Sequence, residues 1–259
     1  MEHQQPEGMT SLEQIRATTG NDACIRAFDE KKRQNSEAAL TQLNAQETTF
    51  PTLYLLAPGI GDLANRLSER NLIAIGIVAE LTRSAGEPLM DLSSPNQSVH
   101  TTLLWMLHTG YTEHTLDEPY QKVMDLVCSI LLDIDKSILP QVCALIFERK
   151  KRGQCIHDLV WAFFRTKDAA ALRLLAERLD SEEKAEHALA RSLLHMNEGG
   201  NGDTAPQTDR AGYGEWLNEV EPFLFFTGLG HQFSSSPVMW GVDYAKKDAW
   251  ETGGSEARR

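Results

Sequence analysis

Two histidines of one predicted helix have the residue type of a metal site but not its spacing. His187 and His195 lie eight residues apart, two helical turns from each other. Histidines that bind one metal ion from a single helix usually lie four residues apart, on neighbouring turns. Glu183 and Glu186 add carboxylates beside His187, but acidic side chains favour the start of a helix for electrostatic reasons. We therefore interpret this group as a solvated helix start and expect no metal ligand in it.

A thiol and an imidazole at the start of another predicted helix could form a nucleophile and its base. Cys155 and His157 are separated by one residue, and a helix N-terminus stabilises a thiolate. A nucleophilic cysteine also needs a base that a third group orients, and the pattern offers no such group. Packing is therefore the favoured role of Cys155. Three further histidines flank a different helix and its following loop, and we interpret them as dispersed polar residues: His100, His108 and His114.

The short motifs of phosphate, nucleophile and zinc sites are missing from the sequence. It contains no G-x-x-x-x-G-K-[ST], G-x-S-x-G or H-E-x-x-H. Residues 181–184 match S-x-x-K without its companion motifs, and a capping role explains Ser181. Residues 59–61 and 228–230 are Gly-x-Gly without the strand-to-helix context of a phosphate loop. We predict no catalytic, cofactor-binding or metal-binding residues and no cofactor, and we favour a non-enzymatic role over an enzymatic one.

The acidic balance of the chain disfavours two classes of partner. The 259 residues carry 25 Lys and Arg against 37 Asp and Glu, a net charge of −12. Such a charge repels phosphate backbones and anionic lipid surfaces, so we expect neither nucleic acid nor a membrane as partner. The basic cluster at residues 149–152 suits a helix C-terminus. The longest apolar run, residues 72–79, is too short to cross a bilayer, which takes about 20 residues.

Cysteine usage and the N-terminal residues indicate a compartment. The four cysteines form no C-x-x-C pair, and such sparse usage is typical of a reducing environment: Cys24, Cys128, Cys143 and Cys155. The first seven residues are polar and acidic, unlike a signal peptide. We expect the protein in the cytoplasm.

The first half of the chain predicts irregularly spaced helices. Residues 1–10 are expected to be flexible, and residues 11–196 to form a helical domain. Residues 50–59 are apolar and fit either a short helix with Pro51 in its first turn or a buried strand. Residues 72–81 are apolar on every side, and their continuation to a Gly-Glu-Pro stop favours a helix packed on both faces.

Five amphipathic helix patterns follow one another between residues 117 and 196. In the first, apolar residues recur at the spacing of one helix face: Val123, Leu126, Val127, Ile130, Leu131 and Ile134. Because the loops between the patterns are short, consecutive helices must pack antiparallel, which predicts a stack of helical hairpins. This pattern, clearest over residues 155–179, resembles the HEAT and armadillo repeats over roughly a third of the chain. The resemblance implies an all-α fold of stacked antiparallel helical hairpins, an α-solenoid.

The C-terminal part has a different composition. Residues 197–212 are rich in Gly, Asn, Asp and Thr, which predicts an exposed linker. Residues 213–259 then form an irregular aromatic tail, with apolar segments at 223–226 and 238–244. A tail this apolar must lie against the helices or against a partner.

A protein partner is the leading expectation for function. Trp161, Phe163 and Phe164 are bulky neighbours that cannot all face one core, so we expect at least one of them to project outward. Since aromatic side chains dominate interface energetics, we predict Trp161, Phe164 and Trp240 as partner-binding residues. The leading hypothesis is a non-enzymatic interaction, scaffold or adaptor protein. The alternative is a helical enzyme or small-molecule binder with a pocket between the N-terminal helices and the hairpin stack, and the oligomeric state stays open.

Overall fold

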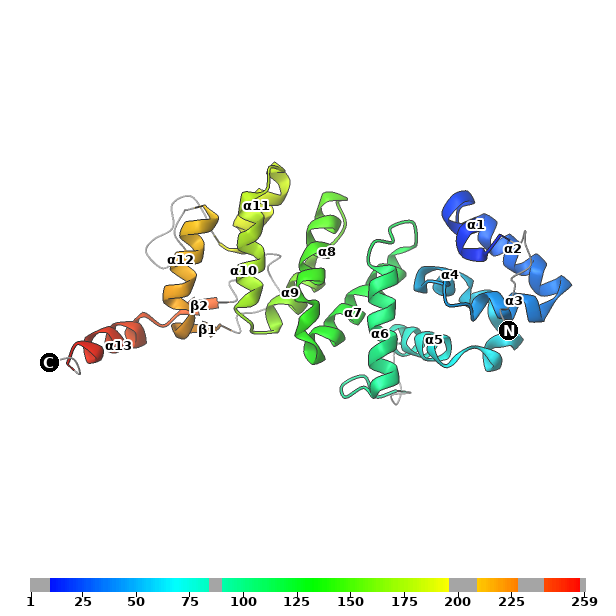
Figure 1. The fold of residues 1–259 in the computed structure, drawn as a ribbon, viewed down its shortest axis with the longest axis horizontal. Helices are drawn as coiled ribbons and strands as arrows, with labels where there is room; N and C mark the ends of the chain where they lie inside the picture. The colour runs from blue at the N-terminus through cyan, green and yellow to red at the C-terminus, as the bar shows by residue number, and fades with distance from the viewer. Residues whose placement is uncertain (1–9, 84–89, 196–208, 228–239, 257–259) are drawn as a thin grey trace, which may run out of the picture. The chain divides into compact units, whose positions relative to one another are not determined.

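A computed structural model gives the fold of the chain (Figure 1). It describes four stretches, residues 10–83, 90–195, 209–227 and 240–256. Within them nearly all regular structure is helical, which confirms the all-α prediction. The chain divides into two compact units, Met1–Ile134 and Asp135–Arg259, called unit 1 and unit 2 below. The boundary between them falls inside the run of helices that the sequence predicts over residues 117–196.

The regular structure of unit 1, within its described residues, is helical. The bounds of the helices are α1 (Leu12–Thr19), α2 (Asn21–Gln34), α3 (Ser36–Leu43), α4 (Phe50–Ile60), α5 (Glu69–Thr82), α6 (Gln97–Gly110) and α7 (Glu118–Ile134), with the 3₁₀ turn η1 (Gly61–Arg66) after α4. Several helices begin at a polar residue whose side chain accepts a hydrogen bond from the backbone N–H three residues later: Ser11, Asn35, Ser68 and Asn96. Such N-caps satisfy donors that the first turn of a helix leaves unpaired.

Helix α4 decides between the two structures that the sequence allowed for residues 50–59. Pro51 lies in its first turn, where the missing N–H would have no helical acceptor in any case. Phe50, Leu53, Leu56 and Ile60 are buried at the spacing of one helix face. The segment is therefore a helix that contributes to the core of unit 1.

Helix α5 confirms the helix predicted over the apolar run but not its packing on both faces. Its buried residues recur every third position: Asn71, Ala74 and Ile77. Leu72, in contrast, is 43% exposed, and Ile75 is only half-buried. The prediction of two buried faces is wrong because the helices that α5 packs against, α4, α6 and α7, leave a strip of it uncovered.

Unit 2 contains shorter helices and a small sheet. Its elements are η2 (Lys136–Ile138), α8 (Leu139–Lys151), α9 (His157–Arg165), α10 (Ala170–Glu177), η3 (Arg178–Asp180), α11 (Lys184–Leu193), α12 (Arg210–Val220), η4 (Glu221–Phe223), β1 (Leu224–Phe226), β2 (Trp240–Val242) and α13 (Tyr244–Glu256). Helix α8 packs against α9, α10 and α11. It ends where the basic cluster predicted, before Gly153, whose φ of 70° is the left-handed conformation that glycine adopts easily.

The five helices predicted over residues 117–196 all form, as α7 to α11. In α7, Val123, Val127 and Leu131 are buried as predicted. Leu126 and Ile134 are 41% and 39% exposed, so the apolar face of α7 is wider than the surface that covers it within unit 1.

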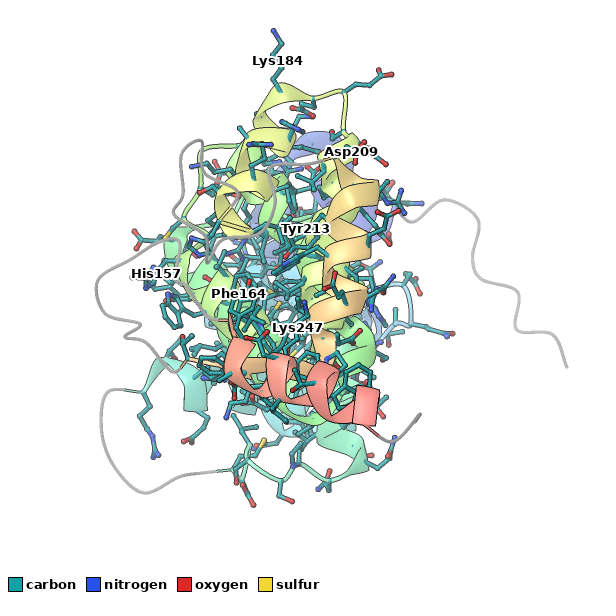
Figure 2. All side chains as sticks on the ribbon, turned by 90° about the vertical axis from the view of Figure 1, so that its left-hand side faces the viewer. His157, Phe164, Lys184, Asp209, Tyr213 and Lys247 are labelled. Carbon is teal, nitrogen blue, oxygen red and sulfur yellow. The ribbon has the colours of Figure 1, made fainter. Side chains whose placement is uncertain are left out.

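The aromatic tail contains more regular structure than its composition suggested. Helix α12 and η4 lead into β1, which pairs antiparallel with β2 so that Phe225 lies opposite Gly241. Figure 2 shows α13 crossing below α12, and Lys247 of α13 forms an ion pair with Glu219 of α12. The sequence did not predict the hairpin, because strands of three residues are too short to show alternation.

Some predictions fall on residues outside those described. These are the flexible N-terminus up to residue 9, the Gly-Glu-Pro stop at 86–88, the linker from 197 to 208 and the Gly-x-Gly at 228–230. Helix α12 begins at Arg210, within the range predicted as the end of that linker. None of the helices in the described part of the chain combines the length and the apolarity that crossing a bilayer requires.

Candidate binding groove

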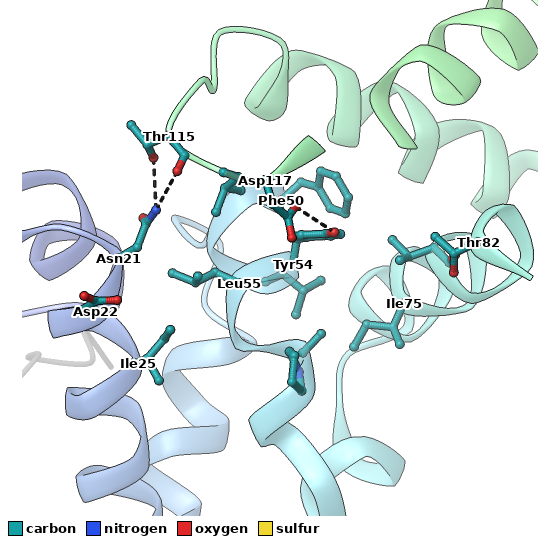
Figure 3. A pocket seen from close by; sticks show the side chains of 15 residues that line it. Asn21, Asp22, Ile25, Phe50, Tyr54, Leu55, Ile75, Thr82, Thr115 and Asp117 are labelled. Carbon is teal, nitrogen blue, oxygen red and sulfur yellow. Dashed lines mark hydrogen bonds between the residues drawn. The ribbon is translucent and has the colours of Figure 1, made fainter. Parts of the chain in front are cut away.

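Four segments of unit 1 surround an open hollow of about 580 Å³, called the unit 1 groove below (Figure 3). They are α2, α4, α5 and residues 115–117 of the loop between α6 and α7. Most of the lining is apolar, including Ile25, Leu55, Pro58, Ile75 and Val78. A volume of this size and an apolar lining are typical of ligand sites.

The groove is held at one end by a lysine of α2. Lys32 Nζ donates hydrogen bonds to the carbonyl oxygens of Gly59 and Ile60, at 3.0 Å each, and forms an ion pair with Asp62. A cation beside the last carbonyls of a helix opposes the negative end of its dipole. This contact fixes the end of α4 against α2.

Polar side chains at the other end tie the α6–α7 loop to α2 and α4. The Tyr54 hydroxyl donates to Asp117 Oδ1 at 3.2 Å, and Asn21 Nδ2 donates to the carbonyl oxygen and hydroxyl of Thr115 at 3.3 and 3.2 Å. Burial, together with the negative charge of Asp117, raises the pKa of Tyr54 to about 12. The phenol therefore stays protonated and keeps donating to Asp117 at any physiological pH.

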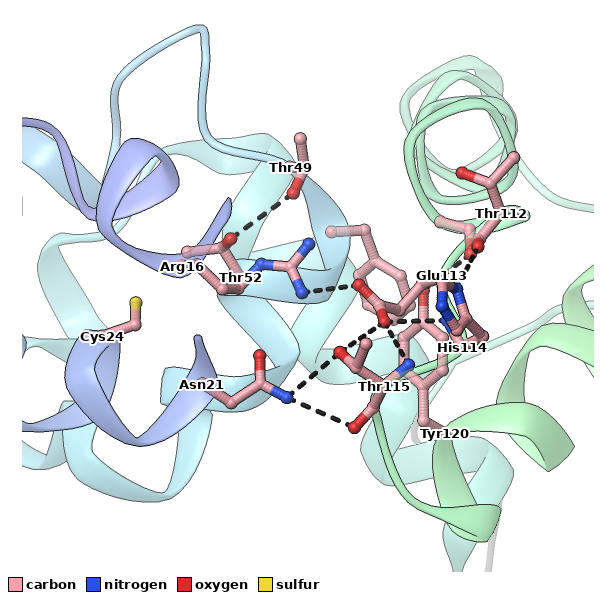
Figure 4. A network of polar contacts seen from close by, with 12 residues as sticks. Arg16, Asn21, Cys24, Thr49, Thr52, Thr112, Glu113, His114, Thr115 and Tyr120 are labelled. Atoms are coloured by element: carbon pink, nitrogen blue, oxygen red, sulfur yellow. Dashed lines mark hydrogen bonds and ion pairs between the residues drawn. The ribbon is translucent and has the colours of Figure 1, made fainter. Parts of the chain in front are cut away.

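A largely buried ion pair joins this loop to α1 (Figure 4). Arg16 Nη1 of α1 donates to Glu113 Oε2 at 2.5 Å, and the two side chains are only 13% and 8% exposed. Glu113 Oε1 accepts from the backbone N–H of His114 and from the N–H and hydroxyl of Thr115. Burial by itself raises the pKa of Glu113, but the hydrogen bonds from Thr115 and Arg16 outweigh it and lower the pKa to about 2.

A second carboxylate, Glu13 of α1, fixes the start of α4. Glu13 Oε2 accepts hydrogen bonds from the N–H and hydroxyl of Thr49 and from the hydroxyl of Thr52. Glu13 and Arg16 lie one turn apart on α1. One helix therefore positions both the floor of the groove and the loop at its rim.

The three aromatic residues predicted to bind a partner lie elsewhere, in unit 2. Trp161 and Phe164 are 8% and 1% exposed, and Phe163 between them is fully buried. The expectation that one of these neighbours projects outward is wrong, because every residue of α9 from Leu159 to Phe164 is buried. Trp240 is half-buried in β2, where its ring meets Phe226 edge-on. Their assignment as partner-binding residues stays a prediction.

The histidine and cysteine candidates are not assembled into a site. His195 follows the end of α11 with a φ of 55°, so the prediction that it shares one helix with His187 is wrong. Cys155 is exposed, and the ring of His157 lies 6.1 Å from that of Trp161. The described stretches hold no group of three or more His, Cys, Asp or Glu side chains arranged to bind a metal ion. In the basic cluster, Lys151 pairs with Glu183 and Arg152 with Glu148.

Sequence reasoning missed the residues of the unit 1 groove. Asp22, Tyr54, Ile75 and Asp117 belong to four different segments, and none of them stands in a motif. One feature of the sequence does point to the groove. Residues 72–81 are apolar on every side, more than one packed helix face needs, and the additional apolar residues form a wall of the groove.

Comparison with known proteins adds no relative. No protein-family model, no curated protein and no solved structure matches the chain.

Proposed function

We propose that this chain is a non-enzymatic interaction protein, a scaffold or adaptor, that binds a partner protein in the unit 1 groove. The observation that carries the proposal is the uncovered apolar strip of α5 beside an open, apolar hollow. Contiguous exposed apolar surface on a folded protein marks interaction sites.

The strip is longer than the hollow itself. Leu72 is 43% exposed, and Ile75, Val78 and Thr82 of the same helix line the hollow. At 1.5 Å per residue, the distance along α5 from Leu72 to Thr82 is about 15 Å. An elongated apolar surface bordered by two helices suits a partner helix laid into a groove.

The finer fold belongs to the same proposal. The succession α7 to α11, joined by short connections, and the packing of α8 on α9 to α11 support a HEAT-like α-solenoid. The four cysteines are free thiols, which supports the cytoplasm as location. The net charge of −12 supports a partner that is not nucleic acid.

A small-molecule binder is the second candidate. The observation that favours it is the volume of about 580 Å³, within the range of small-ligand pockets. This hollow lies within unit 1, among residues 21–117. The length of the α5 strip favours the protein partner.

Affinity purification from the native host with matched baits tests the proposal. The baits are the wild-type chain, Ile75→Asn in the groove, and Leu126→Asn on the exposed face of α7. Because burying one such side chain contributes about 1.5–3 kcal/mol, Ile75→Asn should weaken a purified partner's binding about tenfold to a hundredfold.

The outcomes separate the two candidates. A protein that co-elutes with wild type and Leu126→Asn but not with Ile75→Asn supports the proposal. A small molecule released from the wild type by denaturation and missing from Ile75→Asn, with no such protein, would replace it by the second candidate. Thermal unfolding of all three baits checks that the half-buried Ile75 can be changed without loss of the fold.

A further inference from the structure

We infer that the occupant of the unit 1 groove is an amphipathic helix that carries a Lys or Arg beside its apolar face. This inference rests on the proposed function and names the chemistry of the partner. It follows from which polar groups of the groove are already paired and which are left for a ligand.

The hydrogen-bond donors of the lining side chains are all used within the chain. Asn21 Nδ2 donates to Thr115, and the Tyr54 hydroxyl donates to Asp117. The Thr82 hydroxyl donates to the carbonyl oxygen of Val78, and the Thr115 hydroxyl donates to Glu113. A ligand that brings carbonyl or carboxylate groups would therefore find no side-chain donor in the lining.

The carboxylate oxygens of the lining, in contrast, can still accept hydrogen bonds from a ligand. Within the described stretches, no hydrogen bond or ion pair joins the exposed carboxylate of Asp22 to another residue. Asp117 accepts from Tyr54 and from the N–H of Tyr120 through Oδ1, which leaves Oδ2 open. The lining contains these two carboxylates and neither Lys nor Arg. A cationic donor on the ligand complements this rim.

Asp22 of α2 and the apolar residues of α5 lie on opposite sides of α4. Figure 3 shows Asp22 and Ile25 on α2 at one side and Ile75 and Thr82 on α5 at the other. Asp29, two turns after Asp22 on α2, lies against Gly59 at the end of α4. A ligand above α4 therefore meets the carboxylates of Asp22 and Asp29 on the α2 side, whereas the α5 residues that line the groove carry no charge.

A helix fits this division better than an extended peptide. An extended chain would turn backbone carbonyl oxygens toward a surface that has no spare side-chain donor, and buried unpaired carbonyls are costly. A helix pairs its own backbone groups and presents different side chains to its two flanks. The occupant is thus a helix with apolar residues toward α5 and a basic residue toward α2.

Selection from a displayed library of helical peptides against the full-length chain tests the inference. Counter-selection against Ile75→Asn removes peptides that bind elsewhere. Enriched peptides should carry Lys or Arg within one turn of an apolar residue. Binding of a selected peptide should weaken about tenfold in Asp22→Lys, since each exposed ion pair is worth up to about 1 kcal/mol and reversal adds repulsion.

A matched control and a charge swap isolate the electrostatic contact. Glu30→Lys makes the same charge change on α2 outside the groove lining and should leave binding unchanged. A peptide whose basic residue is replaced by Glu should bind Asp22→Lys more tightly than wild type. Asp22 is chosen over Asp117 because Asp117 also accepts the N–H of Tyr120 at the start of α7.

Three results would overturn the inference. The first is that selected peptides require Ile75 but are neutral or acidic, or bind Asp22→Lys as tightly as wild type. The groove would then still bind a protein, but the basic residue of the partner would be refuted. Self-association that Ile75→Asn abolishes, seen by light scattering, would make a second copy the occupant. Enrichment that does not differ between wild type and Ile75→Asn would remove the proposed function as well.

Discussion

The ion pair between Arg16 and Glu113 should be the pH-sensitive support of the groove rim. Glu113→Gln keeps the shape of the side chain but replaces one acceptor oxygen by an NH₂ group. That group must face either Arg16 Nη1 or the Thr115 donors, so one set of donors loses its acceptor. Among the described residues, the guanidinium of Arg16, 13% exposed, then keeps Glu13, at 3.8 Å, as its one ionic partner.

The pKa of Glu113 sets the size of this effect. A fall from 4.5 to about 2 corresponds to at most about 3.5 kcal/mol at about 1.4 kcal/mol per unit. Nearby solvent screens part of this, so we expect Glu113→Gln to destabilise unit 1 by about 1–2 kcal/mol at pH 7. Because the folded pKa is lowered, the stabilisation is present above pH 4.5 and is lost as the pH falls toward 2.

Hydrogen exchange measured by mass spectrometry is the suitable assay, because two compact units need not unfold in one transition. Amides of α1 and of the α6–α7 loop should exchange faster in Glu113→Gln than in wild type at pH 7, after correction for intrinsic rates. The difference should shrink at pH 3. Glu37→Gln is the control, since Glu37 pairs with Arg66 at the surface and its loss should change little. Equal protection of wild type and Glu113→Gln at pH 7 would refute the reasoning.

Two further predictions concern packing and thiol access. Gly110→Ala should destabilise the protein by about 2–3 kcal/mol in thermal unfolding, because the added Cβ would lie 2.5 Å from the Tyr120 hydroxyl. The same change at Gly214, where the added Cβ meets nothing within 4 Å, should stabilise α12 by about 0.5–1 kcal/mol. A lower Tm in both variants would contradict the difference in packing between Gly110 and Gly214. A thiol reagent should modify Cys155 quickly in the folded protein, and fast modification of more than one thiol would contradict the burial of the other three: Cys24, Cys128 and Cys143.

The helices could be predicted from the sequence because their signals are local. The apolar spacing in α7 to α11 and the glycine after α8 are visible within windows of about 15 residues. How far each helix is covered depends on distant segments. For this reason Leu72 of α5, expected to be buried, is exposed. One of Trp161, Phe163 and Phe164 was expected to project outward, and all three are buried.

The groove could not be predicted, because its residues come together only through tertiary packing. Asp22 and Asp117 are 95 positions apart, and neither differs from an ordinary surface carboxylate in the sequence. Asp117 is held by a third segment, since it accepts a hydrogen bond from the Tyr54 hydroxyl of α4. The pairing of Arg16 with Glu113, which holds the loop in place, joins residues 97 positions apart.

Site-specific photo-crosslinking from the groove in the native host tests the central claim most directly. A benzophenone amino acid replaces Leu55, which lines the groove, and the same probe at Glu30 reports background. We predict a protein that crosslinks from position 55 only, through a segment with helical apolar spacing and a Lys or Arg within one turn of it. The same adducts from both positions, or an acidic segment crosslinked from position 55, would contradict the account.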